Sequence, residues 1–491
     1  MIPASIPSFI DGRSLDCSGE RFIKLDPNTG STLAWMHKAR QADVDAAMDA
    51  ARRGFREWSA TPAEQRLQVL ASAAALMRER CRELAGLEAQ ETGRPLDGVL
   101  VSSVQSGADC LDDFANAAAL LFDAEQPART GTRTVHEPLG VCVGAGSSHR
   151  PLHSACALTA PALAAGNAVV FKPSELAPAG ALRLAQILCE AGLPPGVFNV
   201  LQGRRGTAGL LLGHRDAAVV LAGPSQGSGN LPKATAVGET AGSDDTSIRS
   251  AVIVFDDADV EAACSAAVSA FDSNGATGNG GACVFVQRSL ASGLVTRLAA
   301  RAGRLHIGPA TGSETDVGPL TDGTQLARML SFINACVESG AKLAAGGHRV
   351  ADPDLVGGFF LAPTVLTGCT DDMLTPAAGA AGPLLAVLGF DDECEVIERA
   401  NAAFRGGAAA IFTRDADRAQ RIVAAVRADT AWINSFDPPT RPSSRDRMDA
   451  NIVSMPCHWA TLLRLVRVKR IHAEPVRRPS RAGVTQAHLE L

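Results

Sequence analysis

The sequence predicts an α/β protein with two doubly wound parallel sheets. Short apolar runs that end at Gly or Pro alternate with helix-like segments along most of the 491 residues. With 46% hydrophobic and only 20% charged residues, the chain is long enough for two or three domains with large cores. Strands joined by crossover helices form parallel sheets, in which ligands bind beyond the carboxyl ends of the strands.

The first half of the chain begins with helices and continues with alternating strands and helices. Residues 41–88 are rich in Ala, with charged residues at helical spacing, and predict two or three amphipathic helices. Helices are then expected over 154–165 and 177–191. The apolar runs around them predict buried strands at 139–144, 167–173, 196–201 and 217–222.

A second alternating unit begins at residue 250. Asp and Ala residues at 256–259 follow a buried strand at 251–255 and are expected to cap a helix that runs to residue 271. Two further segments, 130–137 and 462–471, are expected as strands that leave the body and pair with another subunit. Later strands of the second unit are expected at 284–286, 363–366, 408–412 and 430–433.

Composition argues against several other classes of protein. The formal net charge of −6 disfavours a general nucleic-acid surface. The most apolar run, 155–171, contains Pro, Gly and Asn and falls short of the about 20 apolar residues of a membrane span, so no membrane partner is expected. The 12 cysteines form no CxxC pair and no signal peptide starts the chain, which predicts reduced thiols in the cytoplasm.

No metal site is expected either. His149 and His153 lie four residues apart near a predicted helix start, but no carboxylate or Cys is placed to complete a ligand set.

Several blocks of sequence carry a resemblance to a known family. The blocks are HEPLGV at 136–141, APALAAGNAVVFKPSE at 160–175, AGLPPGVFNV at 191–200, VFDDAD at 254–259, VGPL at 317–320, FLAPTV at 360–365 and WIN at 432–434. They resemble the NAD(P)-dependent aldehyde dehydrogenases over nearly the whole chain. Within that family, the resemblance is to the betaine-aldehyde group.

The resemblance implies a fold and an assembly. It implies a Rossmann-like cofactor domain over 1–125 and 138–248, a catalytic-type α/β domain over 249–437, and oligomerisation strands over 126–137 and 460–474. The expected assembly is a homodimer or a homotetramer.

The resemblance also implies a mechanism, but the nucleophile position departs from it. Family members use a Cys thiolate to attack the aldehyde, an amide side chain to stabilise the oxyanion, and a Glu to activate water. Counting back from the strand at 284–286, Gly278 occupies the nucleophile position, and Cys283 falls where the strand begins. His149 stands at the amide position, where a neutral imidazole donates one hydrogen bond.

The general base has two alternatives. Counting back from Phe255 places Asp245 at its position, which needs fewer gaps. An eroded motif with inserted residues places Glu239 there instead, which keeps a glutamate.

The resemblance implies NAD or NADP as the cofactor, but this sequence matches only some of the residues that contact it in the family. Lys172 and Glu175 match the pair that resembles a clamp on the adenosine ribose hydroxyls. Gly223 lies in the phosphate-facing turn, but Pro224 follows it and removes a hydroxyl and an N–H group. Residues 379–383 read GAAGP, without the carboxylate and ring that hold the nicotinamide ribose in the family.

We interpret the chain as a catalytically degenerate aldehyde-dehydrogenase-like protein. With Gly278 at the nucleophile position, it would act as an oligomeric partner, a regulatory subunit or a carrier subunit. One such assembly would be a hetero-oligomer with an active homologue. The alternative is an active NAD-dependent dehydrogenase that oxidises a small, betaine-type aldehyde, with Cys283 as a displaced nucleophile and Glu239 as the base.

Overall fold

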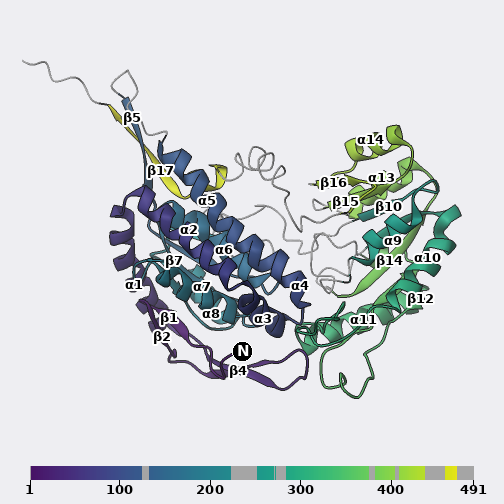
Figure 1. The fold of residues 1–491 in the computed structure, drawn as a ribbon, viewed down its shortest axis with the longest axis horizontal. Helices are drawn as coiled ribbons and strands as arrows, with labels where there is room; N and C mark the ends of the chain where they lie inside the picture. Colours follow the sequence, from purple (N-terminus) through teal and green to yellow (C-terminus); the bar gives the residue numbers. More distant parts are fainter. Residues whose placement is uncertain are drawn as a thin grey trace, which may run out of the picture.

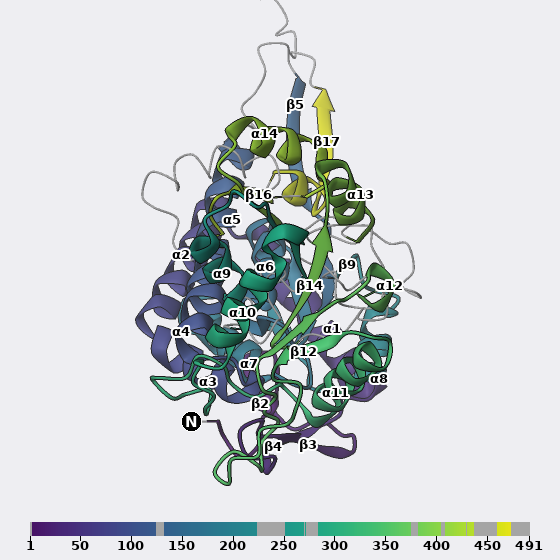
Figure 2. The same cartoon turned by 90° about the vertical axis from the view of Figure 1, so that its right-hand side faces the viewer.

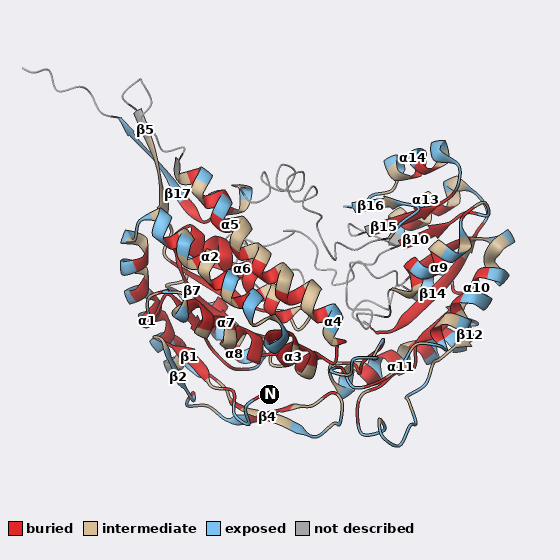
Figure 3. Ribbon diagram, viewed as in Figure 1, coloured by how far each residue is buried: buried red, intermediate tan, exposed pale blue. Residues whose placement is uncertain are grey.

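The computed structural model contains two bodies, each built around its own sheet (Figure 1). It describes residues 2–123, 132–222, 251–269, 271, 283–374, 382–403, 408–428, 430–436 and 459–472. The central strands of both sheets are buried beneath helices, as Figure 3 shows by colour, whereas β2 and β16 at sheet edges are mostly exposed. The prediction of an α/β protein with two parallel-sheet bodies is confirmed.

The first sheet has the strand order β2-β1-β8-β7-β6-β9. Four adjacent strands, β8, β7, β6 and β9, are parallel, and each lies where an apolar run predicts a strand. β1 and β2 extend the sheet beyond β8 as antiparallel strands and were not expected from the sequence. The bounds are β1 (Ser8–Ile10), β2 (Arg13–Leu15), β6 (Val141–Ala145), β7 (Ala168–Lys172), β8 (Phe198–Val200) and β9 (Val219–Ala222).

Helices pack on both faces of this sheet, and three of them, α1, α2 and α3, account for the Ala-rich region at 41–88. Small Ala side chains let helices and sheet approach closely, and the indole N–H of buried Trp58 donates to the Leu163 carbonyl at 2.9 Å. The bounds are α1 (Gln41–Ala60), α2 (Ala63–Glu79), α3 (Cys81–Thr92), α4 (Leu96–Val99), the π-helical segment η1 (Leu100–Gln105), α5 (Ser106–Asp123), α6 (Pro151–Ala164), α7 (Ala179–Glu190) and α8 (Arg205–Leu212).

The second sheet has the order β12-β13-β14-β11-β10-β15-β16, parallel except for β12 at one edge. Asp259 caps α9 by accepting from the N–H groups of Glu261 and Ala262, which confirms the predicted cap. The strands are β10 (Ala251–Val254), β11 (Cys283–Gln287), β12 (Lys342–Ala345), β13 (Thr364–Thr367), β14 (Leu384–Phe390), β15 (Ala408–Phe412) and β16 (Thr430–Ile433). The helices are α9 (Val260–Val268), α10 (Arg288–Ala302), α11 (Gly323–Glu338), α12 (Asp371–Leu374), α13 (Glu393–Ala403) and α14 (Ala416–Ala425).

The two bodies meet where α3 ends. Gly93 ends α3 with a φ of +80°, and a Cβ there would lie 2.1 Å from the carbonyl oxygen of Pro319, so only glycine allows this approach. The hydroxyl of Thr321 donates to the carbonyl of Thr92 at 3.0 Å. A hairpin of β3 (Arg21–Leu25) and β4 (Thr32–His37) spans both bodies, and Lys24 Nζ donates to the Thr321 carbonyl at 3.4 Å.

The two segments expected to leave the body pair with each other. β5 (Thr132–Pro138) and β17 (Val466–His472) form an antiparallel ribbon that projects from the first body (Figures 1 and 2). Residues 459–463 form a helical turn before β17, where the sequence predicts a strand from residue 460. Pairing of this ribbon with another subunit stays a prediction. None of the helices in the described ranges is both long and apolar enough to cross a bilayer.

Candidate functional site

The carboxyl ends of the first sheet's parallel strands bring three segments together. Ala145, at the end of β6, lies beside Lys172 of β7 on one side and beside Ala222 of β9 on the other. Parallel α/β sheets bind ligands at this edge. The sequence-predicted cofactor residues Lys172 and Glu175 therefore lie where a dinucleotide is expected.

Lys172 and Glu175 form an ion pair just beyond β7. Lys172 Nζ donates to Glu175 Oε2 at 3.1 Å; the lysine side chain is 5% exposed and the glutamate side chain 36%. Burial lowers the pKa of Lys172, and the Glu175 carboxylate partly opposes this effect. An ammonium donor next to a partly exposed carboxylate acceptor fits the hydroxyl groups of a ribose, which both donate and accept.

Four other sequence-predicted site residues lie outside the described residues: Gly223, Gly278 and the two alternatives for the general base, Glu239 and Asp245. Ala222, directly before Gly223, is the last residue of β9.

Cys283 is the first residue of β11, in the middle of the second sheet. Its ladder partners are Ala251 on β10 and Ala386 on β14, and it is 2% exposed within an apolar cluster. Nearby Cys369 has its pKa raised to about 12 by burial, with a smaller contribution from Cys283. This is the setting of a packed core thiol, whereas reactive thiolates lie in partly exposed, electropositive places. The prediction that Cys283 attacks a carbonyl stays a prediction.

His149 lies in the short segment between β6 and α6. Its backbone N–H donates to Ser147 Oγ at 3.0 Å, and its buried Nδ1 has no hydrogen-bond partner among the described residues. Burial lowers the pKa of His149 well below its usual range, and Arg94, Arg150 and His153 lower it further. Burial thus favours the neutral imidazole, the form to which the sequence motif assigns one hydrogen-bond donor.

His153 makes different contacts. Its Nδ1 lies 2.7 Å from Ser106 Oγ, and burial lowers its pKa to about 3, with Arg150 next in effect. Arg150 lies close enough to lower the pKa of both histidines, and its positive charge disfavours a metal cation between them. The expectation that the protein has no metal stays a prediction.

A buried polar cluster behind His149 was not found by sequence reasoning. Arg94 is 4% exposed; its Nη2 donates to Ser102 Oγ at 2.8 Å and its Nη1 lies 3.5 Å from Glu88 Oε1. Glu88 Oε2 accepts from Ser103 Oγ at 2.7 Å. Burial raises the pKa of Glu88 despite the nearby Arg94. We call Glu88, Arg94, Ser102, Ser106, His149, Arg150 and His153 the Arg94 cluster.

Arg150 completes this cluster from the start of α6. Its Nε donates to the Ser102 carbonyl at 2.6 Å and its Nη2 to Ser106 Oγ at 2.9 Å. Arg150 has a φ of +48°, a left-handed conformation that costs energy in a non-glycine residue and often marks functional sites. His149, which stands at the family's amide position, was the sequence signal next to Arg150.

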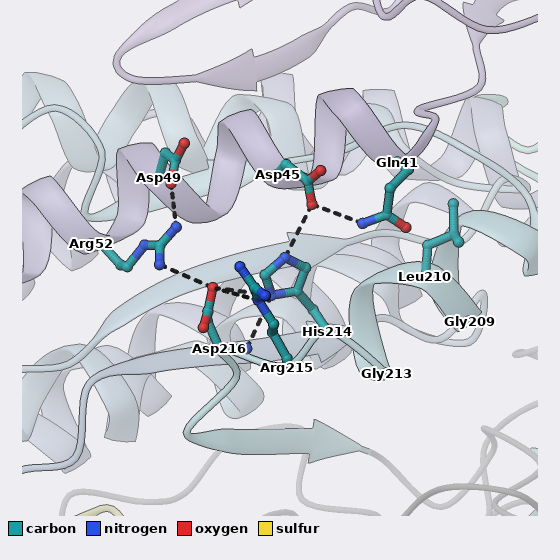
Figure 4. Close-up of a pocket in the computed structure, with 10 residues that line it drawn as sticks. All are labelled: Gln41, Asp45, Asp49, Arg52, Gly209, Leu210, Gly213, His214, Arg215 and Asp216. Atoms are coloured by element: carbon teal, nitrogen blue, oxygen red, sulfur yellow. Dashed lines mark hydrogen bonds and ion pairs between the residues drawn. The ribbon is translucent and has the colours of Figure 1, made fainter.

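A pocket of about 610 Å³ lies between α1 and α8, away from the motif residues (Figure 4). Its charged side chains pair with one another: His214 Nε2 lies 3.1 Å from Asp45 Oδ1, and Arg52 Nη1 donates to Asp216 Oδ2 at 2.9 Å. Arg52 also contacts Asp49. Because these side chains satisfy each other, the pocket does not point to a ligand.

Residues 15–444 match the model of the family described as "Aldehyde dehydrogenase family". The chain belongs to the aldehyde dehydrogenase family. Among curated relatives, it is 41% identical over 433 residues to a betaine aldehyde dehydrogenase of Cereibacter sphaeroides, covering 87% of this chain and 89% of the relative. The resemblance that the sequence motifs indicate is thus confirmed.

Solved aldehyde dehydrogenases share this fold. An aldehyde dehydrogenase from Bacillus cereus, solved as a complex with NAD+, matches with a TM-score of 0.82 and 28% identity over 95% of this chain and 96% of that one. A betaine aldehyde dehydrogenase point mutant from Staphylococcus aureus, also in complex with NAD+, matches with a TM-score of 0.81 and 26% identity over 95% and 96% of the chains.

Proposed function

We propose that this aldehyde dehydrogenase binds NAD or NADP at the carboxyl edge of the first sheet and oxidises a small aldehyde with it. The observation that carries the proposal is the Lys172–Glu175 pair, 3.1 Å apart at the end of β7. A dinucleotide-bound relative of the same fold adds support. Betaine-type aldehydes are the substrates to test first, because the curated relative is a betaine aldehyde dehydrogenase.

Lys172, Glu175 and His149 would have separate roles in cofactor binding and catalysis. Lys172 would donate to a ribose hydroxyl of the cofactor and Glu175 would accept from one, which fixes the adenosine end at the sheet edge. The bound cofactor would supply the hydride acceptor. The neutral His149 would donate a hydrogen bond to the oxygen that gains negative charge when a nucleophile attacks the aldehyde.

Cys283 is the thiol that this proposal would use. Its sulfur would bond to the aldehyde carbon, and loss of a hydride from that carbon would leave a thioester. Water, activated by Glu239 as the base, would cleave the thioester and release the acid and the thiol. Cys283 would first have to become accessible, since it is 2% exposed.

The second candidate function is a non-catalytic, dinucleotide-binding subunit. The burial of Cys283 in β11 favours it, as does Gly278 at the counted nucleophile position. In this function the protein would act as an oligomeric partner, regulatory or carrier subunit, alone or with an active homologue.

One experiment separates the two. Purified protein is mixed with betaine aldehyde and either NAD or NADP, and production of the reduced cofactor is followed by absorbance. Turnover that disappears in Cys283→Ala but persists in Cys394→Ala, which changes an exposed thiol on α13, supports the catalytic proposal. Binding of NAD or NADP without any turnover contradicts it and supports the second candidate.

We also propose assembly as a homodimer or homotetramer through the β5–β17 ribbon, in the cytoplasm. Val468 is 50% and Ile471 40% exposed on this ribbon, a setting that favours burial against another subunit. No disulfide joins the cysteines in the described ranges, which suits a reducing compartment. Light scattering on the purified protein measures the mass, and a monomer would contradict the assembly.

A further inference from the structure

Arg94 carries hydrogen-bond donors that no described residue satisfies. The residue is 4% exposed, and its Nε and Nη1 atoms are buried without a hydrogen-bond partner among the described residues. Nη1 keeps only a contact of 3.5 Å with Glu88 Oε1, which also lacks a hydrogen bond there. Burying guanidinium donors that have no partners costs free energy of folding. This cost indicates that a ligand completes the site.

Within the Arg94 cluster as described, two guanidinium groups accompany one carboxylate. Arg94 and Arg150 are close enough that Arg150 contributes to lowering the pKa of Arg94, and both lower the pKa of His149. Glu88 is the one carboxylate among the members of the Arg94 cluster, and burial raises its pKa, which weakens its compensation. An anion is therefore the ligand that the charges of this cluster favour.

The backbone supports a binding role for the same residues. Arg150 is held at a φ of +48° by hydrogen bonds to Ser102 and Ser106. Ser102 lies in η1, a π-helical segment, and such segments are frequent at functional sites. The Arg150 guanidinium thus joins two irregular parts of the backbone, its own left-handed residue and the π-helical segment η1. Helices α4, α5 and α6 lie on the side of the first body that faces the second (Figure 1).

We propose that the Arg94 cluster binds the carboxylate of the substrate, so that the preferred aldehyde is a semialdehyde with an anionic tail. Arg150 makes an ion pair with the carboxylate, Arg94 donates to it from its unpartnered Nε and Nη1 groups, and Ser102 and Ser106 hold the two guanidinium groups in place. Two guanidinium groups with fixed donors match the planar oxygens of a carboxylate. The aldehyde part of this inference rests on the proposed function, whereas carboxylate binding does not.

A quaternary ammonium tail fits this cluster poorly. Proteins recognise such cations with the faces of aromatic rings, and the segment at 147–150 reads Ser-Ser-His-Arg. Arg94 and Arg150 would repel the tail. The cluster thus selects against the cationic aldehyde that the relative's name suggests.

Calorimetry with succinate and with choline tests the charge preference directly. Succinate carries the carboxylate without an aldehyde, and choline carries the quaternary ammonium group. Three variants are compared with the wild type: Arg150→Asn, which removes the charge and tolerates the left-handed conformation; Glu88→Gln with Arg94→Gln, which avoids leaving Glu88 buried alone; and Arg183→Gln as the control. Arg183 pairs with Glu83 on the surface of α7 and is outside the cluster.

Succinate is expected to bind the wild type and Arg183→Gln equally, and Arg150→Asn about 10- to 100-fold more weakly, because a charged hydrogen-bonding partner is lost. The double variant is expected to weaken binding as well, and circular dichroism checks that it folds. Choline binding as tight as that of succinate, or succinate binding that Arg150→Asn leaves unchanged, would overturn the inference, as would no succinate binding at all.

Activity assays distinguish this inference from the proposed function. Turnover of succinic semialdehyde in preference to betaine aldehyde, lost in Arg150→Asn, supports both. Succinate binding that depends on Arg150, without turnover of any aldehyde, supports the carboxylate site while contradicting catalysis. Turnover of betaine aldehyde that Arg150→Asn leaves intact supports catalysis and overturns the carboxylate site.

Discussion

The side-chain amide of Asn167 donates to the backbone carbonyl of Leu465 at 3.0 Å, across 298 positions of sequence. The oxygen of the same amide accepts from the N–H groups of Leu139 at 2.7 Å and Gly140 at 3.0 Å. Asn167 is fully buried, so one side chain joins the start of β6 to the segment that leads into β17.

Replacing Asn167 by Ala is expected to destabilise the protein. The variant leaves the N–H groups of Leu139 and Gly140 without their acceptor, and each buried unsatisfied group costs about 1–3 kcal/mol. Urea unfolding followed by circular dichroism measures the change. Gln68→Ala, which removes an exposed amide from α2, is the control and should change stability by less than about 0.5 kcal/mol. Equal effects of the two variants would contradict the joining role of Asn167.

The lowered pKa of buried His153 predicts that the folded protein loses stability in acid. Burial lowers its pKa from the ordinary 6.5 to about 3 in the folded protein. Between these pH values the unfolded chain binds a proton that the folded one does not, so this contribution is present above pH 6.5 and is lost as the pH falls toward 3.

The comparison variant is His153→Asn, which keeps a partner for Ser106 but does not titrate. The melting temperature of the wild type is expected to fall relative to that of the variant as the pH is lowered from 7 to 4, in a thermal unfolding series. Melting curves that shift in parallel at every pH would show that His153 does not carry the effect.

The thiols are expected to react with iodoacetamide in an order set by exposure. Cys394 is exposed at the start of α13 and should be alkylated first among the cysteines of the described ranges, whereas Cys283 in β11 and Cys142 in β6 should react slowly. Burial also raises the pKa of Cys142 to about 12, which reduces the thiolate that reacts. Timed alkylation followed by peptide mass spectrometry gives the order. Labelling of Cys283 before Cys394 would contradict its core position and would favour Cys283 as a nucleophile.

Local patterns predicted most of the framework. The buried run at 167–173 became β7, and Asp259 caps α9, because each depends on residues close in sequence. β14 (Leu384–Phe390) was not predicted, because a continuous apolar run is not assigned to a strand by periodicity alone. β1 and β2 were not predicted either, because they become strands by pairing along a sheet that distant segments form.

The candidate site was predictable only where the motif is local. Lys172 and Glu175 lie three residues apart in one block of sequence, so the motif alone predicts that they act as a pair. The Arg94 cluster depends on contacts between distant positions, such as Glu88 with the N–H of Leu152 at 3.2 Å, which no spacing reveals. Gly223, Glu239 and Gly278 lie outside the described residues and stay sequence predictions.

Calorimetric titration with NAD and NADP tests the central claim, that Lys172 and Glu175 hold a dinucleotide. The wild type is expected to bind one of the two cofactors, and Lys172→Met and Glu175→Gln to bind it about tenfold or more weakly, because each loses a hydrogen bond to a charged group. Lys38→Gln, which removes a lysine that pairs with Glu20 on the surface, should bind as the wild type does. Binding of neither cofactor by the folded wild type, or unchanged affinity in Lys172→Met and Glu175→Gln, would contradict the account.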